Sequence, residues 1–425
     1  MMYIPCILYG RKWSQSGRIS DMPSFSKHNM QVLYLYAATL AGSLLGFVTS
    51  IVNTNFLTEQ EYGDVRYVQN LITLFASLLL FGYFLSGSRL LAMSKDRLNS
   101  CRIRGAMVVV LVICSLILVL VTLVAGLFHM GQMSLGILFF VSLPVCFYPL
   151  LTNYMNTTAQ GDNHIGRLAM SRFLPALLYI PVGYFVYQAH GATPTLMVLL
   201  QWGIYTLVLL LLVVSTKPSF CSLRSVFKEL RIENEQYGKH LYYGSLAMVA
   251  TNYLAGFTLG IFNDDNVNVG FYTLALTLTA PLAYLPGIIG TAYFKKFVSE
   301  PSIPAKVFKG TLLITVLSCV CFILFIRFFV QWFYPVSYAI VGDFASWMAV
   351  GFSVHGLGDM INRFLGSHGE GRAIRNSSYA CGAFKIFGFV FLVWIWDIYG
   401  ALLTNVISSC VYSLLLYFYY RKRKK

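Results

Sequence analysis

The chain has 425 residues, of which 57% are hydrophobic and only 11% are charged. A soluble protein usually has about 25% charged residues, and a soluble core cannot bury the apolar runs that recur here from Met30 to Tyr420. Each run has about 20 residues, enough to cross a bilayer as a helix. Composition therefore excludes a soluble protein and predicts an all-α integral membrane protein.

Twelve apolar segments are predicted to be transmembrane helices. They cover 30–57, 71–92, 107–128, 135–155, 173–189, 195–214, 241–262, 269–293, 310–332, 340–362, 377–396 and 400–420. Residues 1–29 form a tail, in which basic residues follow a short apolar run, the reverse of a signal peptide. The polar segment 215–240 divides the spans six and six. We expect a cytoplasmic linker there, between an N-lobe at 30–214 and a C-lobe at 241–420, with a basic tail at 421–425.

Basic residues set the orientation of the predicted spans. With the N-terminal tail placed inside, the outside connections hold only Arg66, and three basic residues lie within spans: Arg89, Arg327 and Lys385. All other lysines and arginines of the 31 fall in inside segments. Because cytoplasmic connections are enriched in Lys and Arg, both termini are predicted to be cytoplasmic. The net charge of +15 is spread over loops, which argues against a nucleic-acid partner.

Several short motifs recur in order along the two halves. "TEQEYGDVRY" around Gly63 corresponds to "DNVNVGFYTL" around Gly270, and "QGDNHIGR", ending at Arg167, corresponds to "LGSHGEGR", ending at Arg372. The separations lie between 205 and 209 residues. A nearly constant separation indicates an internal duplication. Since six spans is an even number, we expect two six-helix lobes in the same orientation, related by a pseudo-two-fold axis along the membrane normal.

Three segments resemble the polysaccharide flippases, which are bacterial carriers of lipid-linked oligosaccharide. They are "FLTEQEYGDVRYVQNLITLFASLLLFGY" at 56–83, residues 242–297, and "QWFYPVSYAIVGDFASWMAVGF" at 331–352. The resemblance covers Met30 to Tyr420. The wider superfamily also contains multidrug extruders and carriers of the peptidoglycan lipid precursor. Related sequences often carry an Asp in the seventh span, and the corresponding "TNYLAGFTLG" of this chain has none.

The resemblance implies alternating access between the two lobes of an inner-membrane protein. The implied cargo is an undecaprenyl-pyrophosphate-linked oligosaccharide for O-antigen or a related surface polysaccharide, handled among membrane lipids, with a polysaccharide polymerase and a chain-length regulator as further partners. Translocation needs no covalent step, so no catalytic residue, cofactor or metal is expected. The nine cysteines form no CxxC pair, and a GxxxxGK[ST] phosphate loop is absent from the sequence.

Charged and polar residues within spans are costly unless they face a cavity or a partner. The cavity candidates are Lys385, Arg89, Arg327 and Asn252. Lys385 lies about 12 Å into the eleventh span by helix rise, where it could pair with the diphosphate, pair with a neighbouring helix, or snorkel to the cytoplasm. Arg89 and Arg327 lie near span ends, where snorkelling is the alternative. Asn252 could equally be a hydrogen-bonding contact between helices.

Asp359 and His355 are predicted to form a coupling pair. They lie four residues apart in the tenth span, which places them on one face of a helix. Histidine titrates near neutral pH, so the pair could respond to protons. The alternative interpretation is a hydrogen bond that holds helices together.

Two other functions compete with that of a flippase. A multidrug or cation extruder would favour buried carboxylates, whereas the deep ionisable residues here are more often basic. A polyprenyl-linked glycosyltransferase or polymerase would use external carboxylates, for which Glu59, Glu61, Asp64, Asp264 and Asp265 are available. However, the outside connections have about 13 residues or fewer, which leaves little room for a loop that binds two sugar chains.

Overall fold

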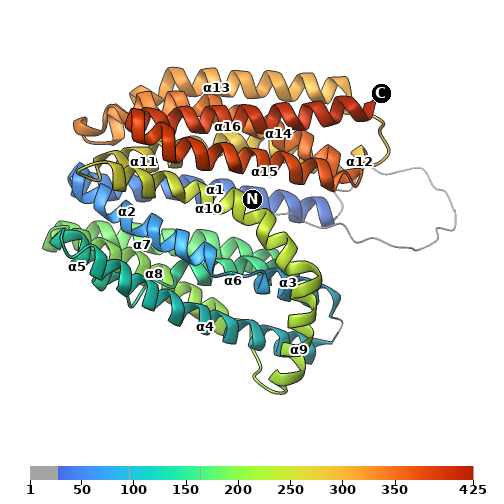
Figure 1. Ribbon diagram of the computed structural model, residues 1–425, viewed down its shortest axis with the longest axis horizontal. Coiled ribbons are helices and arrows are strands. Elements are labelled where there is room, and N and C mark those ends of the chain that lie inside the picture. Colours follow the sequence, from blue (N-terminus) through green and yellow to red (C-terminus); the bar gives the residue numbers. More distant parts are fainter. Residues whose placement is uncertain (1–26, 95, 163, 425) are drawn as a thin grey trace.

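The computed structural model describes residues 27–94, 96–162 and 164–424, and every regular element in them is a helix (Figure 1). The first half contains α1 (Lys27–Phe56), α2 (Glu59–Leu78), α3 (Tyr83–Met93), α4 (Arg97–Phe128), α5 (Met133–Ser142), α6 (Tyr148–Gly161), α7 (Ile165–His190), α8 (Pro194–Ser215), α9 (Leu223–Glu233) and the π-helix η1 (Asn234–Gly238). The second half contains α10 (Lys239–Phe262), α11 (Val267–Ala292), α12 (Phe294–Phe297), α13 (Ala305–Phe333), η2 (Val336–Tyr338), α14 (Val341–Ser367), α15 (Gly371–Phe387), η3 (Gly388–Leu392) and α16 (Val393–Lys424).

Seven helices in the described part of the chain are long and apolar enough to cross a membrane, or eight when the bent pair of α2 and α3 is one span. Shorter apolar helices occur at Leu40–Phe56, Met133–Ser142 and Tyr253–Phe262. The stretch Gly371–Arg423 holds the eleventh and twelfth predicted spans, and Asp397 breaks it with φ 50° and ψ −131°. The prediction of an all-α membrane protein is confirmed, and the count of twelve spans stays a prediction.

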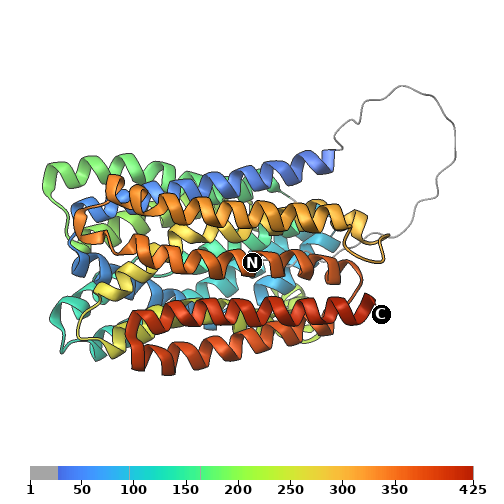
Figure 2. The same ribbon diagram turned by 90° about the horizontal axis from the view of Figure 1, so that it is seen from above.

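The long helices run roughly side by side, so the connections gather at two ends (Figures 1 and 2). The basic end, as we call it, holds the connections after α3, α6, α8, α12 and α14 and the end of α16. The opposite end holds the connections after α1, α4, α7, α10 and α13. The two ends correspond to the inside and outside segments of the predicted topology.

The segment "TEQEYGDVRY" follows the turn between α1 and α2, and from Glu59 onward it is helical, although the sequence predicted a connection between the spans 30–57 and 71–92. Thr58 caps α2: its Oγ1 accepts a hydrogen bond from the backbone N–H of Glu61, and the Glu61 carboxylate accepts one from the backbone N–H of Thr58 at 3.0 Å. This reciprocal capping box satisfies two backbone donors that a helix start leaves free. Arg66 therefore lies within α2 and not in a connection, which corrects its predicted position.

Two of the predicted spans are broken. The second bends by 60° between α2 and α3, where Phe81 and Gly82 have φ values of 43° and 81°. The fourth, predicted at 135–155, consists of the two short helices α5 and α6. At the first break, the linker satisfies the freed backbone: Asn234 Nδ2 donates to the Phe81 carbonyl at 3.2 Å, and Asn234 Oδ1 accepts from Ser86 Oγ at 3.1 Å. Non-helical backbone within a membrane protein is stable when other groups of the protein form hydrogen bonds with its free polar atoms.

The two halves of the chain form two helix groups. In the first, α1 packs on α7 and α7 on α8; in the second, α11 packs on α14 and α14 on α16. The groups meet where α2 packs against α10 and α11. There, a Cβ added to Gly270 would lie 3.1 Å from the Gly63 Cα, and one added to Gly63 would lie 2.0 Å from the Asn266 carbonyl oxygen. Equivalent positions of the repeat thus pack directly on one another.

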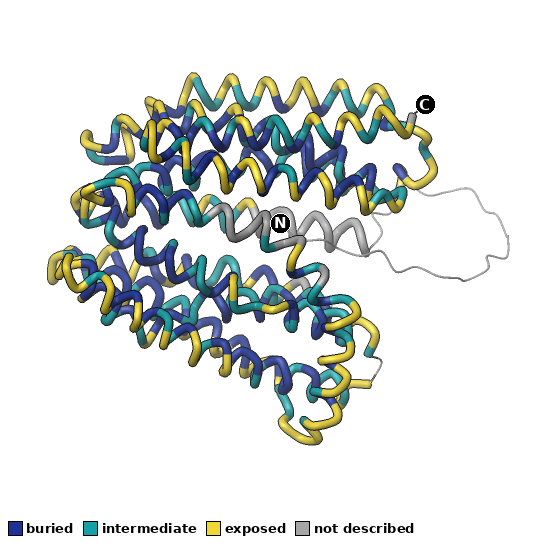
Figure 3. Tube along the Cα trace, viewed as in Figure 1, coloured by how far each residue is buried: buried dark blue, intermediate teal, exposed yellow. Residues whose placement is uncertain are grey.

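Burial follows this arrangement (Figure 3). Buried residues lie where helices face one another, and the outward faces of α4 and α13 carry large exposed apolar side chains, such as Leu116, Leu120, Leu313 and Phe325. A soluble protein rarely exposes such continuous apolar surface. These faces are suited to contact with lipid.

We expect Gly63→Ala to destabilise the protein, because the added methyl would force α2 away from α11. Overpacking of this kind costs about 1–3 kcal/mol, which thermal denaturation of the detergent-purified protein would report as a lower melting temperature. Gly203→Ala in α8 is the matched control, since a Cβ there meets nothing within 4 Å. Equal melting temperatures for the two variants would contradict the close crossing.

Candidate functional site

A buried polar cluster lies among α14, α15 and α16. Asp359 and Lys385 are each only 7% exposed. Asp359 Oδ1 accepts a hydrogen bond from the Tyr412 hydroxyl at 3.1 Å, and that hydroxyl accepts one from Asn362 Nδ2 at 2.7 Å. The His355 ring stacks on the Tyr412 ring, with centroids 4.5 Å apart and an interplanar angle of 19°. We call these five residues the α14–α16 cluster.

Helical spacing and small residues build this cluster. His355, Asp359 and Asn362 follow one another at intervals of four and three residues, so they share one face of α14. Gly358 lets α16 approach, because a Cβ there would lie 2.5 Å from Ser413 Oγ and 2.9 Å from the Tyr412 ring. Close helix packing at small residues is a usual source of contact within membranes. The sequence thereby places Tyr412 between the histidine and the carboxylate.

The ionisable members of the cluster interact electrostatically. The charges of Asp359 and Lys385 both act on His355, so two residues predicted as a coupling pair and one predicted as a cavity cation lie in one site. Asp359 Oδ2 is buried and accepts no hydrogen bond from the described residues. A buried polar atom without a hydrogen bond is costly, so Oδ2 is an unused acceptor within the cluster.

Arg89 is engaged by the linker. Its guanidinium Nη1 lies 2.7 Å from Glu233 Oε1, and its carbon lies 4.5 Å from the centroid of the Tyr237 ring. The ion pair and the cation–π contact connect α3 to the end of α9 and to η1. Arg89 is thus held at the basic end, with 39% of its side chain exposed, and its function in a cavity stays a prediction.

The two remaining cavity candidates, Arg327 and Asn252, lie outside the α14–α16 cluster. Arg327 Nε lies 2.6 Å from Asp343 Oδ1, and both side chains are exposed, at 65% and 51%. This places Arg327 in an ion pair on the surface between α13 and α14, away from the α14–α16 cluster. Asn252 belongs to α10, and its side chain lies outside the described residues.

Arg172 is a basic residue within a helix, although the sequence predicts that it lies in a connection. The structure extends α7 to Ile165, eight residues before the predicted start of the fifth span at 173, and so places Arg172 within a helix. Its charge acts on Tyr284 of α11, whose hydroxyl is hydrogen-bonded to Ser43 of α1. Arg172 of the first helix group thus interacts electrostatically with the second. Hydropathy does not predict that Arg172 is helical, because the first turns of α7 are polar and resemble a connection.

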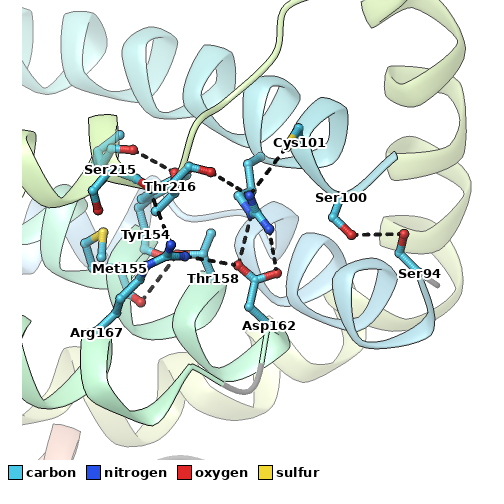
Figure 4. A network of polar contacts seen from close by, with 12 residues as sticks. Ser94, Ser100, Cys101, Tyr154, Met155, Thr158, Asp162, Arg167, Ser215 and Thr216 are labelled. Carbon is cyan, nitrogen blue, oxygen red and sulfur yellow. Dashed lines mark hydrogen bonds and ion pairs between the residues drawn. The ribbon is translucent and has the colours of Figure 1, made fainter. Parts of the chain in front are cut away.

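A polar network closes the basic end of the first helix group (Figure 4). Arg104 of α4 forms a bidentate ion pair with Asp162 after α6, with Nε–Oδ2 at 2.9 Å and Nη2–Oδ1 at 3.2 Å. Its Nη1 also donates to the Thr216 carbonyl at 2.5 Å, and Arg167 lies 4.0 Å from the same carboxylate. Because Asp162 is 6% exposed, we assign the network a structural role: it fixes α4, α6, α7 and the end of α8.

Asp162→Asn should lower the melting temperature strongly, because the substitution leaves the Arg104 charge nearly buried without its carboxylate. Breaking a buried ion pair costs about 3–5 kcal/mol. Glu235→Gln is the control: it breaks an exposed pair with Lys239, which is worth about 0.3–0.5 kcal/mol. A melting temperature for Asp162→Asn as high as that of Glu235→Gln would contradict the structural role.

Solved structures with the same fold are membrane transporters. An inward-closed lipid II flippase, MurJ, matches with a TM-score of 0.69 and 13% identity over 92% of this chain and 87% of its own. An inward-facing multidrug resistance MATE family transporter of the MOP superfamily matches with a TM-score of 0.64 and 15% identity over 92% and 98%. At these identities the likeness shows the fold. No curated protein matches the sequence.

The family of the chain follows from its sequence. The model of the polysaccharide biosynthesis protein family matches residues 30–299, which is more than half of the chain and includes two of the three segments on which the resemblance was based. The resemblance is confirmed. This chain is a membrane protein of the polysaccharide biosynthesis protein family, with the fold of the MOP superfamily transporters.

Proposed function

We propose that the protein is a flippase that moves undecaprenyl-pyrophosphate-linked oligosaccharide repeat units, for O-antigen or a related surface polysaccharide, across the bacterial inner membrane. The observation that carries the proposal is the family match over residues 30–299, on a fold shared with a lipid II flippase. The proposed architecture has twelve spans in two six-helix lobes, related by a pseudo-two-fold axis, with both termini in the cytoplasm. The basic end is then the cytoplasmic end.

The physical task is to carry a diphosphate and sugars through about 30 Å of hydrocarbon. An unpaired charge is too costly there, so the path must supply polar partners. Arg172 is suited to this, since its charge acts on Tyr284 of the second helix group and a guanidinium can pair with phosphate in bidentate geometry. No covalent bond changes in the proposed cycle. Each helix group in turn would separate from the other at one end, giving alternating access.

The α14–α16 cluster is proposed to couple an ion gradient to this motion. In this proposal the pair of His355 and Asp359 responds to protons through the histidine, and the charge of Lys385 acts on that histidine. Because the cluster lies within the second helix group, a change in its charge alters the packing of α14 against α15 and α16. Arg89, Arg327 and Asn252 remain secondary cavity candidates.

Deletion of the gene tests the proposed function directly. We expect the loss of surface polysaccharide, with the lipid-linked repeat unit accumulating at the cytoplasmic face of the membrane. An enzyme that polymerises the repeat would give another result: single units, already translocated, would accumulate on the outer face. That outcome would overturn the flippase.

Lys385→Met should reduce complementation of the deletion at least about tenfold, because a neutral side chain removes the buried charge that acts on His355. Lys385→Arg keeps a charge and should retain part of the activity. Lys306→Met, at an exposed position in the first turn of α13, is the control and should complement like the wild type. Surface polysaccharide is measured at matched protein levels; full complementation by Lys385→Met would exclude a function for this charge.

A drug or cation extruder is the second candidate function, which the similarity to MATE family transporters and the buried Asp359 favour. The two functions differ in their phenotypes. Cells that lack an extruder accumulate cationic dyes and keep their surface polysaccharide. Increased ethidium accumulation in the deletion strain, with intact polysaccharide, would support the extruder over the flippase.

A further inference from the structure

Tyrosines from both helix groups gather at the opposite end of the molecule. They are Tyr62 of α2, Tyr179 and Tyr187 of α7, and Tyr334 and Tyr338 of the connection after α13. All five are buried, with at most 4% exposed. The Tyr62 and Tyr338 rings meet edge to face at 6.0 Å, and the hydroxyls of Tyr179 and Tyr187 lie 2.8 Å apart. Neither the α14–α16 cluster nor the diphosphate path described above uses these residues.

Arg66 lies among these tyrosines. Its guanidinium carbon is 4.9 Å from the centroid of the Tyr62 ring, and its Nη1 donates to Gln69 Oε1 at 3.0 Å. Its charge acts on Tyr179, Tyr205, Tyr334 and Tyr338. Among the described residues Arg66 has no ion-pair partner, and its Nε is buried with no hydrogen-bond acceptor. The Arg66 guanidinium has five N–H donors, and only some of them are hydrogen-bonded within the described residues.

Amide side chains extend this polar region. Asn53 is fully buried: its Oδ1 accepts from the Tyr179 hydroxyl at 2.6 Å, whereas its Nδ2 has no partner among the described residues. Gln69 Nε2 donates to Gln201 Oε1 at 3.3 Å, and both glutamines are 5% exposed. The buried Tyr62 hydroxyl is also without a partner there. Since buried polar atoms are normally hydrogen-bonded, several unused ones in one place indicate a region that is built to receive a ligand.

The second helix group covers this region in the present conformation. The Tyr334 hydroxyl is hydrogen-bonded to Ser50 Oγ of α1 at 2.8 Å, and the Tyr338 hydroxyl donates to the Thr58 carbonyl at 3.4 Å. If the two groups separate at this end, Ser50 keeps its hydrogen bond to the Phe47 carbonyl but loses the one to Tyr334, and the Tyr62 ring loses a packed neighbour. An uncovered polar group is stable only when water or a ligand replaces its hydrogen bond. A ligand with many hydroxyls supplies such replacements.

The side chains of this region indicate the chemical class of ligand that it could bind. Amides and a guanidinium hydrogen-bond to pairs of hydroxyls, and aromatic rings offer apolar faces to the C–H faces of a sugar. A diphosphate fits less well, because Arg66 is the one basic residue of α2 and three carboxylates lie near it on the same helix: Glu59, Glu61 and Asp64. The region is suited to an uncharged, hydroxyl-rich group.

We propose that Asn53, Tyr62, Arg66, Gln69 and Gln201 form a sugar-binding station for the glycan of the cargo, which Tyr334 and Tyr338 cover until the two helix groups separate at the opposite end. The inference rests on the proposed function. It adds a separate site for the sugars, distinct from the path of the diphosphate, and makes the two covering tyrosines competitors of the sugar.

Binding to the purified full chain in lipid nanodiscs tests the station with two probes. One is the undecaprenyl-pyrophosphate-linked saccharide extracted from cells that lack the protein, and the other is undecaprenyl pyrophosphate without sugar. We expect Arg66→Lys and Gln69→Leu to weaken binding of the saccharide probe at least about tenfold, since a site built for hydroxyls depends on its polar groups. Binding of the sugar-free probe should stay unchanged. Gln132→Leu, exposed in the connection after α4, is the control.

The outcomes of this binding experiment distinguish the proposed sugar-binding station from the proposed flippase function. Equal losses for both probes, or no loss for either variant, would overturn the sugar-binding station and leave the flippase standing. A wild-type protein that binds neither probe would overturn the flippase and the station together. Melting temperatures establish that the variants fold, and Tyr338→Phe, which removes only a covering hydroxyl, should bind the saccharide probe at least as tightly as the wild type.

Discussion

The contact of Gly63 with Gly270 is the constraint on which the arrangement of the two helix groups depends. Within a bilayer the hydrophobic effect does not drive helices together, so close packing of small residues and hydrogen bonds between helices must do so. At this crossing the backbones approach closely enough for Asn266 Nδ2 to donate to Asp64 Oδ1 at 2.8 Å. The same approach brings the covering tyrosines of one group over the polar side chains of the other.

Hydropathy predicts most of the helices, because a helix that crosses a membrane requires a long apolar run. It does not predict where such a helix is broken. The apolar run 71–92 contains the 60° bend at Phe81 and Gly82, and apolar composition carries no information about such a bend. The start of α2 was predictable in principle, since Thr58 and Glu61 have the spacing of a capping box. The low hydropathy of that turn favours a connection instead, and Arg66 is therefore predicted in a loop.

The candidate site was predictable to the extent that its residues share one helix. Spacing alone placed His355 and Asp359 on one face of α14. It could not show that the charge of Lys385 in α15 acts on His355, because that depends on how the helices pack. Nor could it identify Arg172, since the first turns of α7 are polar and the helix was expected to begin at 173. Contacts between residues that are distant in the sequence depend on tertiary structure, which a local sequence pattern does not predict.

The way the linker fills the bend between α2 and α3 determines which parts can move together. Asn234 holds the Phe81 carbonyl and Ser86, and Glu233 holds Arg89, so α3 is joined to the segment that leads directly into α10. Since α3 also packs against α4 and α6, a rotation of the helix groups that keeps all these contacts would carry η1 along with the first group. The boundary between the two rigid bodies would then lie where η1 passes into α10, and the linker would move with the first half of the chain.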